Sequence, residues 1–532
     1  MRPAICRPLL QPAGSDHGSN QRYCRFMRPF RLIARDTRRP KPLILVPILA
    51  LLTLSVWSFA SPVGSSPDDD FHLASIWCSA GDTSGLCGQE QQADERLVPK
   101  DLVVDAVCYA HNPKQSAACQ GQDFGTHPNT VVTTARGNFA GLYPPVFYAA
   151  MSIFAGPNIV ISVLLMRLFA SLIFVAVITG LFLLLPRRRR PALVWSTLVT
   201  MVPLGLFIVA STNPSGWAVL SAATLWVALL GYFETTGWRK VALGAFATLA
   251  TVIGAGSRAD SAVFAGVAIV AVLIIATRRS RFFVLSSILP VALLVVAVLF
   301  FLSAGQSAAG STGLEPGSVG PNPSQVKGLI VYNLLNVPDL WVGAFGHWGL
   351  GWLDTTMPAV VWVAAFGCFV AAMYVAMRKA SWRRSLASIW VLAGLWIFPT
   401  IVLVKTGAIV GGYVQPRYVL PLIVLLAGVA LSNHSNPTLG LSRRELFILA
   451  VPLAAAQSIA LITNMRRYVA GADSGGLNLD SNPAWWWHIP VSPMAMWAIG
   501  SLAFSGLLLV LILAITRTRP MATTRPGPEP VG

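Results

Sequence analysis

Charged residues are scarce in this sequence of 532 residues. Only 11% are charged and 55% are hydrophobic, and the mean hydropathy is +0.63. A soluble globular chain carries about 25% charged residues. The shortage excludes a soluble enzyme and predicts an all-α integral membrane protein that crosses the bilayer many times.

Motifs of several other protein classes are missing. The chain has no GxxxxGK[ST] phosphate loop, and the segments between its apolar runs on the basic side are short, which argues against a nucleotide-driven pump. It has no HExxH motif and no CxxC pair, and His111, His127 and His347 show no metal-ligand spacing. A structural zinc site is therefore not expected, whereas a divalent cation such as Mg²⁺ or Mn²⁺ on aspartates stays open.

Long apolar runs dominate what is present, and they predict twelve transmembrane helices. The spans are expected at about 42–60, 157–185, 191–210, 216–233, 240–256, 261–277, 282–304, 356–377, 385–404, 418–432, 445–463 and 494–516. The fifth and tenth are shorter than the ~20 residues needed to span, so tilted or re-entrant segments are alternatives. The first run has a signal-peptide alternative because it ends in Ser58-Phe59-Ala60, but its length favours an uncleaved helix.

The net charge of +18 comes mainly from short basic runs between apolar segments, such as 187–190 and 278–281. This distribution follows the positive-inside rule and does not suggest nucleic-acid binding. It predicts a plasma-membrane protein with both termini cytoplasmic. The basic tail 1–41 is expected to be disordered, the membrane domain to span 42–516 and a second tail to cover 517–532. The outer loops are expected at 61–156, 305–355 and 464–493.

Cysteines are few, and four of the seven fall in the first outer loop. Four cysteines in an oxidising compartment suggest two disulfides with three possible pairings. Neighbouring pairs, Cys78 with Cys87 and Cys108 with Cys119, would close the shortest loops; four free thiols are the alternative. Cys6, Cys24 and Cys368 are expected to stay reduced.

An acidic cluster follows the first apolar run directly. Asp68, Asp69 and Asp70 precede Phe71 and His72. Charge beside a membrane is costly unless it is paired or used, so this cluster is a candidate functional site. The simpler interpretation is the acidic first turn of a helix, where carboxylates offset the helix dipole. The two interpretations are compatible.

Other candidates stand at the predicted outer ends of spans. Tyr143 opens a Tyr-Pro-Pro entry to the second span, and Asn213 belongs to a Thr-Asn-Pro-Ser-Gly turn that its residue types explain by themselves. Arg258 and Asp260 form either an internal ion pair or a ligand contact. Arg417, followed by Tyr418, has no acid nearby in sequence, so its guanidinium suits a phosphate; snorkelling or an acid from another loop is the alternative.

Tryptophans and a pair of arginines mark the later outer loops. Residues 341–352 and Trp485-Trp486-Trp487-His488 are most simply membrane-interface residues, with stacking on a sugar or lipid headgroup as the alternative. Arg466-Arg467 has a phosphate-binding alternative, although adjacent arginines are more often merely solvated.

Together these motifs resemble the DUF2142 family of bacterial polytopic membrane proteins over roughly residues 45–430. The family's Asp-Glu-x-x-His motif corresponds to residues 68–72, with Asp in place of Glu. The Pro-Pro-aromatic entry, the Asn-Pro-Ser-Gly turn and the Ser-Arg-x-Asp segment (257–260) follow in order. A Gly-Arg-Tyr motif reads Pro416-Arg417-Tyr418 here, so its glycine is missing.

The family is similar to the GT-C membrane glycosyltransferases, and this implies a function. A sugar would pass from a polyprenyl-phosphate donor to a cell-envelope glycan or protein on the outer face, with the lipid bilayer as surroundings. Asp68 or Asp69 would be the base and Arg417 or Arg258 the phosphate clamp. His72, Tyr143, Asn213, Asp260 and Tyr418 would line the substrate site. A transporter or flippase, or a non-catalytic assembly partner for lipid-linked glycans, is the alternative.

Overall fold

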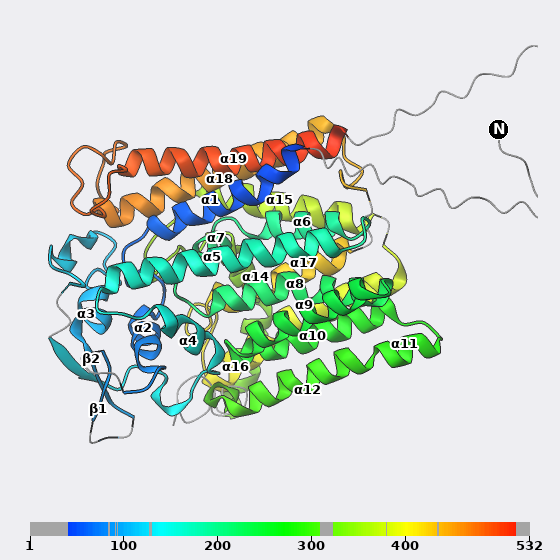
Figure 1. Ribbon diagram of the computed structural model, residues 1–532, viewed down its shortest axis with the longest axis horizontal. Helices are drawn as coiled ribbons and strands as arrows, with labels where there is room; N and C mark the ends of the chain where they lie inside the picture. The colour runs from blue at the N-terminus through cyan, green and yellow to red at the C-terminus, as the bar shows by residue number, and fades with distance from the viewer. Residues whose placement is uncertain are drawn as a thin grey trace, which may run out of the picture. The chain divides into compact units, whose positions relative to one another are not determined.

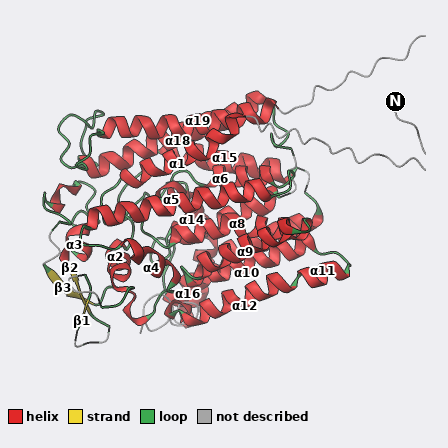
Figure 2. Ribbon diagram, viewed as in Figure 1, coloured by secondary structure: helices red, strands yellow, loops and turns green. Residues whose placement is uncertain are grey.

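The computed structural model of the chain describes residues 41–82, 86–90, 92, 94–126, 130–308, 323–378, 380–432 and 436–517. Helices make up most of these residues (Figures 1 and 2). Cys6, Cys24 and nearly all of the two predicted tails lie outside the described residues.

Eight helices in the described part of the chain are long and apolar enough to cross a membrane. They are α5 (Ile159–Leu184), α8 (Ser215–Glu234), α10 (Ala259–Ala276), α11 (Arg281–Ser286) continuing into α12 (Ile288–Ser303), α15 (Ala359–Met377), α16 (Trp382–Thr406), α18 (Arg443–Val469) and α19 (Pro493–Arg517). Two shorter apolar helices are α1 (Leu45–Phe59) and α17 (Pro416–Leu431). The chain is thus an all-α membrane protein, as its composition predicted.

Two segments differ from the predicted pattern of spans. The run 191–210 is not one helix but two, α6 (Arg190–Thr200) and α7 (Leu204–Val209), and Pro203, which has no N–H to donate, stands between them. The predicted outer loop 305–355 contains α14 (Pro323–Ala344), which packs on α16 and α17. Its Asn333, Asn336 and Asp339 lower the hydropathy of that segment, which hid the helix. The predicted span at 240–256 is α9 (Trp238–Ala255).

The core of the helix assembly is formed by α8 and α17. Helix α8 packs against α9, α10 and α17, and every residue of α17 except Tyr418 is buried. Trp226 of α8 leaves no room on the facing helix, because a Cβ on Gly428 would lie 2.4 Å from the indole. Helix α1 lies beside α5 and α19, as Figure 1 shows. This packing fixes the ends of the helices that carry the candidate site.

The first predicted outer loop gathers with the α18–α19 connection at one end of the assembly (Figure 1, left). This end contains α2 (Asp69–Cys78), α3 (Lys100–Val103), α4 (Val146–Met151) and an antiparallel sheet of β1 (Gly88–Gln89), β2 (Arg96–Pro99) and β3 (Val131–Thr134) in that order. Arg96 pairs with Thr134, and Pro99 with Val131. Short 3-10 turns are η1 (Lys41–Ile44), η2 (Asp105–Val107), η3 (Ala117–Gln120), η4 (Asn138–Ala140), η5 (Ser152–Phe154) and η6 (Gly305–Ala308). Helix α11 lies at the opposite end.

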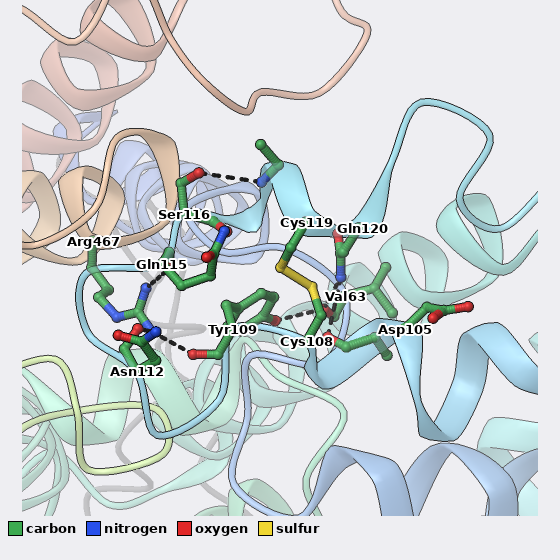
Figure 3. The surroundings of a disulfide bond; sticks show 12 residues. Val63, Asp105, Cys108, Tyr109, Asn112, Gln115, Ser116, Cys119, Gln120 and Arg467 are labelled. Carbon is green, nitrogen blue, oxygen red and sulfur yellow. Dashed lines mark hydrogen bonds between the residues drawn. A yellow bond between two sulfur atoms is a disulfide. The ribbon is translucent and has the colours of Figure 1, made fainter.

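Two disulfides fasten this end, and they join the neighbouring cysteines. Cys78 at the end of α2 bonds Cys87 beside β1, and Cys108 bonds Cys119 (Figure 3). Both pairs are those that close the shortest loops. Cys368 is a buried free thiol, as expected.

Candidate functional site

The site is built around the first turn of α2. Asp68 is the N-cap residue of this helix and has a left-handed backbone, with φ at 60°. Its carbonyl accepts hydrogen bonds from the backbone N–H groups of Phe71 and His72, and Asp69 and Asp70 occupy the first turn. Carboxylates at this position are stabilised by the positive end of the helix dipole. The acidic turn predicted from the sequence is therefore present, and it supports a charge cluster.

Asp69 points into the protein and has a positioning role. Its side chain is fully buried and accepts hydrogen bonds from Thr212 Oγ1 (2.8 Å) and the backbone N–H of Ser66 (3.1 Å). Burial raises the pKa of the Asp69 carboxyl to about 6, against the opposing influence of Arg167. Asn213, which follows Thr212 in the chain, donates from Nδ2 to the Pro67 carbonyl at 2.8 Å. Asp69 and Asn213 thus fix the start of α2 to the connection between α7 and α8.

Asp68 faces the other way and carries the charge of the site. One of its oxygens pairs with Arg417 Nη2, and the other with Arg136 Nη2 at 3.2 Å. Arg136, which follows β3, also pairs with Asp70. Burial acts to raise the pKa of Asp68, but the charge of Arg417 and the weaker influence of Arg136 outweigh it and lower the pKa to about 2. Asp68 is therefore ionised at neutral pH.

Arg417 is the buried cation at this site, and part of its guanidinium has no partner. Its side chain is 3% exposed, and Nη2 donates to Asp68 and to the Tyr418 hydroxyl. Nε and Nη1 have no hydrogen-bond partner among the described residues. Buried charged donors that lack a partner are unfavourable, so Nε and Nη1 of Arg417 are available to an acceptor from outside. The fork of a guanidinium matches the oxygens of a phosphate.

A narrow cavity adjoins Arg417. It is lined by Pro67, Gln415, Pro416, Arg417 and residues of the 349–353 turn, and its volume of about 10 Å³ leaves room for about one water molecule. The side-chain oxygen of Gln415 is buried there without a hydrogen-bond partner among the described residues. Unsatisfied donor and acceptor groups therefore converge beside the guanidinium.

His72 and two tyrosines form a buried wall next to the carboxylate. His72 Nδ1 lies 2.9 Å from the Tyr148 hydroxyl, and its Nε2 has no partner among the described residues. Burial lowers the pKa of His72 to about 3, so the ring is neutral at pH 7. The ring centroid of Tyr143 lies 5.4 Å from that of His72. The wall therefore offers one free imidazole nitrogen and aromatic faces.

Arg258 is a second cation, but its charge is already paired. It forms a bidentate pair with Asp260, at 2.9 Å from Nε and 2.7 Å from Nη2, and Nη1 donates to Ser215 Oγ at 3.3 Å. The Tyr418 ring centroid lies 4.7 Å from the guanidinium carbon of Arg258 and 5.0 Å from that of Arg417. Arg258 and Asp260 are therefore an internal ion pair that supports Tyr418, and Arg417 is the cation with donors to spare.

The backbone that leads to Asp68 is held rigidly from several sides. Arg167, buried in α5, donates to the carbonyls of Ser58, Ser61 and Pro62. These carbonyls lie at or just after the end of α1, where no backbone N–H of the helix is available to donate to them. Arg167, which lies well within the predicted span 157–185, therefore closes the end of a helix.

The loop closed by Cys108–Cys119 supports the same segment (Figure 3). Tyr109 Oη and Gln120 Nε2 both donate to the Val63 carbonyl, at 2.7 and 2.9 Å. At the next residue, Gly64 has φ of 81°, and a Cβ there would lie 2.1 Å from the Ala106 carbonyl oxygen. Only glycine fits at this position. The close contact brings the chain next to the disulfide-closed loop against the segment that precedes α2.

Arg467 fastens the later loops and does not reach the site. It donates to Asp354 at 2.8 Å and to the carbonyls of Tyr109, Asn112 and Gln115. It is thus neither solvated nor free, in contrast to both interpretations of the sequence.

Most of the predicted site residues converge. Asp68, His72, Tyr143, Arg417 and Tyr418 come from three distant segments and meet in one cluster, while Asp69, Asn213, Arg258 and Asp260 support it. Arg136 and Tyr148 were not predicted. Arg136 is an isolated arginine with no motif around it, whereas Tyr148 belongs to the Pro-Pro-aromatic entry and was visible there.

The carboxylates do not fit a dedicated divalent-cation site. Magnesium and calcium take about six or more oxygen ligands, and here Asp68 and Asp70 face guanidinium groups while Asp69 accepts two protein hydrogen bonds. In the described residues no three His, Cys, Asp or Glu side chains are grouped so as to hold a metal ion.

The fold and the site together define an α-helical integral membrane protein with a paired carboxylate and a buried arginine at one end. The chain belongs to the DUF2142 family of predicted membrane proteins, whose family model matches residues 51–426. The match includes Asp68, Arg136 and Arg417 and ends before Arg467. No curated protein and no solved structure matches the chain.

Proposed function

We propose that the protein is a membrane glycosyltransferase of the GT-C type. It moves a sugar from a polyprenyl-phosphate donor to a cell-envelope glycan or protein at the outer face of the membrane. The observation that carries the proposal is Arg417, whose Nε and Nη1 are buried beside the ionised Asp68 with no hydrogen-bond partner in the part of the chain that the structure describes. A cation with free donors next to a carboxylate supplies the two groups that such a transfer requires.

The donor binds through its phosphate to the guanidinium of Arg417. The acceptor hydroxyl loses its proton to Asp68 while its oxygen forms a bond to the anomeric carbon of the sugar. The bond from that carbon to the phosphate oxygen breaks, and the electron pair stays on the phosphate. The N–H groups of Arg417 stabilise this developing charge, which favours the transition state over the bound donor.

The double pairing of Asp68 couples its basicity to donor binding. With Arg417 and Arg136 on its two oxygens, the carboxylate has a pKa of about 2 and is a weak base. A phosphate that binds Arg417 weakens the ion pair between Arg417 and Asp68, and the basicity of Asp68 rises. The base thus becomes effective only when donor is bound.

The neighbouring wall serves to orient the sugar. His72 is neutral and has a free Nε2, and Tyr143 and Tyr418 present aromatic rings beside it. Neutral hydrogen-bonding groups and ring faces suit the hydroxyls and the apolar face of a sugar ring. Arg258 also packs on the Tyr418 ring and helps to hold it in place.

A flippase receives less support from the same residues. Charge that lines a transport path is expected to face a water-filled route. Arg167 is buried instead against the carbonyls that end α1. The contacts of Arg167 with the described residues thus indicate no role for this residue in carrying a lipid-linked glycan.

The test uses the full-length protein in lipid nanodiscs with polyprenyl-phosphate-linked sugars and envelope glycan acceptors. Asp68→Asn is expected to lower the transfer rate by at least about 100-fold, since it removes the base. Arg417→Lys is expected to lower it on the order of 100-fold, because a lysine cannot present a fork to the phosphate. Asp123→Asn is the matched control, since Asp123 is an exposed acid of the same segment.

Three outcomes contradict the proposal. They are full transfer by folded Asp68→Asn protein, equal loss in the Asp123→Asn control, and no transfer by the unmodified protein with any lipid-phosphate sugar. Movement of a lipid-linked glycan across vesicles without transfer would establish the flippase instead.

A further inference from the structure

The connection between α18 and α19 contains a cavity of about 270 Å³, far from the fold's core. Small-molecule pockets in proteins begin at roughly 300 Å³, so the space is that of a small ligand or of one or two sugar units. It lies within residues 470–484, at the same end of the helix assembly as α2 (Figure 1). Nothing in the transfer mechanism above uses it.

The walls of this cavity combine neutral polar groups with apolar ones. The polar side chains are the hydroxyls of Ser474 and Ser481 and the amides of Asn478 and Asn482, and Leu479 is the largest apolar one. Among the described residues, no charged side chain lines the space. Two acids adjoin the lining residues in sequence, and neither lines the cavity: Asp480 accepts from Ser492 Oγ and from the backbone N–H of Met494 at the start of α19, and Asp473 is exposed. A charged ligand would find no counter-charge there, whereas a neutral polyol would find hydroxyl and amide partners.

Several of these groups are free to bind. Asn478 accepts from Asp480 N through Oδ1, while its Nδ2 and the whole Asn482 amide have no hydrogen-bond partner among the described residues. The hydroxyls of Ser474 and Ser481 donate to nearby carbonyls and keep lone pairs for incoming donors. Amides that both donate and accept are well suited to sugar hydroxyls, which do the same.

The cavity is preformed because its rim is fastened to the rest of the protein. Ala472 N donates to the Pro113 carbonyl at 2.8 Å, which ties the rim to the disulfide-closed loop. Ala484 N and Trp485 N both donate to the Val469 carbonyl, at 3.0 and 3.1 Å. A ligand would therefore not have to order this segment on binding, which removes a major cost of association.

Two tryptophans follow the cavity wall in sequence. Trp485 and Trp486 come directly after Ala484, which lines the space, and both are partly buried against the hydrophobic core, with ring centroids 6.0 Å apart. A sugar ring packs its C–H face on an indole and directs its hydroxyls to polar groups at the side. We propose that this cavity and the adjoining tryptophans bind an uncharged carbohydrate chain.

This inference goes beyond the proposed transfer reaction and does not depend on it. The test measures binding of short gluco-, manno- and galacto-oligosaccharides to the full-length protein in nanodiscs by saturation-transfer NMR and calorimetry. Oligogalacturonates are the charged comparators. Binding of at least one neutral chain, in preference to the oligogalacturonates, is expected.

The glycines of the segment provide a matched pair of variants. Gly476 lines the cavity, and a Cβ there meets only the Asn478 carbonyl at 4.0 Å, so Gly476→Trp places an indole in the space. Gly475 does not line it, and nothing lies within 4 Å of its added Cβ, so Gly475→Trp changes the surface alone. Gly476→Trp is expected to weaken binding at least about tenfold, and Gly475→Trp less than about twofold.

The proposal is overturned if no neutral oligosaccharide binds, if the charged chains bind better, or if Gly476→Trp and Gly475→Trp bind equally well. Asp68→Asn keeps the two proposals separate. It abolishes transfer if the site assignment is right, and it leaves oligosaccharide binding unchanged because Asp68 does not line this cavity.

Discussion

Asp68 and Asp69 are adjacent in sequence and have opposite surroundings. The left-handed backbone at Asp68 turns its carboxylate toward Arg417 and Arg136, while Asp69 turns inward to Thr212 and Ser66. The pKa of Asp68 is lowered to about 2, and that of Asp69 is raised to about 6. One acid is thus held as a charge and the other as a structural acceptor.

The raised pKa of Asp69 predicts a pH dependence of stability. An unfolded aspartate has a pKa of about 4, so between about pH 4 and 6 the folded protein holds the Asp69 proton more tightly than the unfolded chain. This contribution to the free energy of unfolding therefore falls as pH rises through that window and stays lower at pH 7. Asp69→Asn cannot ionise, so the fall is expected to disappear in the variant.

The same substitution also lowers stability at pH 7, because it replaces an ionised acceptor of two hydrogen bonds by an amide whose Nδ2 cannot accept, so that one of the two donors, Ser66 N–H or the Thr212 hydroxyl, loses its acceptor. The expected loss is about 1–3 kcal/mol. Thermal unfolding in detergent at pH 4 and pH 7 measures both effects against the Asp123→Asn control. An unchanged difference between the two pH values in Asp69→Asn protein would remove the basis for this role.

The sequence predicted the partners of the site better than their roles. Arg417 was recognised because no acid lies near it in the chain, and its acid came from 349 residues away. The different surroundings of Asp68 and Asp69 could not be predicted from the sequence, because they depend on the φ angle of Asp68. Arg136 was missed because its only distinguishing feature is position, which β3 and the following turn set in space.

At the scale of elements, α2 is held in place by the disulfide-closed loop beside it. Cys108–Cys119 closes a loop whose Tyr109 and Gln120 both bind the Val63 carbonyl, five residues before Asp68. Cys78–Cys87 closes a loop of similar length that ties α2 to β1. The two bridges are therefore comparable in chain entropy and differ in what they support.

Replacing both Cys108 and Cys119 by serine is expected to cost about 2–3 kcal/mol of stability, as is the matched replacement of Cys78 and Cys87. Only the first pair is expected to speed hydrogen exchange at residues 61–67, because it releases the loop that binds Val63. Exchange followed by mass spectrometry on the two variants provides the measurement. Equal exchange in that segment would mean that Arg167 alone fixes it.

Elements were predictable where apolar runs are long and unbroken. The run at 157–185 and the run at 494–516 became α5 and α19 with nearly the expected bounds. The prediction failed at 191–210, where a proline interrupts an apolar run, and at α14, where asparagines interrupt a helical one. Hydropathy records the environment that a segment prefers and not its hydrogen bonding, so it misplaces both kinds of segment.

The whole molecule separates its polar segments between two ends. The first loop and the α18–α19 connection lie at one end, and α11 lies at the other (Figure 1). The basic runs lie at the starts of helices at the α11 end. The positive-inside rule therefore predicts that this end faces the cytoplasm and that the α2 end faces away from it.

Single cysteines at two exposed positions test this orientation in a chain whose Cys6, Cys24 and Cys368 are replaced by serine. Leu477→Cys is expected to react with a membrane-impermeant maleimide in intact cells, because Leu477 is exposed at the α2 end. Arg187→Cys is expected to react only after the membrane is opened. The reverse pattern would place Asp68 in the cytoplasm and contradict a transfer reaction at the outer face.

Arg467 has a consequence for how the protein is made. Its guanidinium joins α18 to the carbonyls of residues 109–115 and to Asp354. Three segments that are synthesised at very different times therefore meet at one side chain. The first loop leaves the ribosome hundreds of residues before that arginine. Until α18 has been inserted, the early loop lacks its contacts with Arg467, and folding of the α2 end is completed from the C-terminal side.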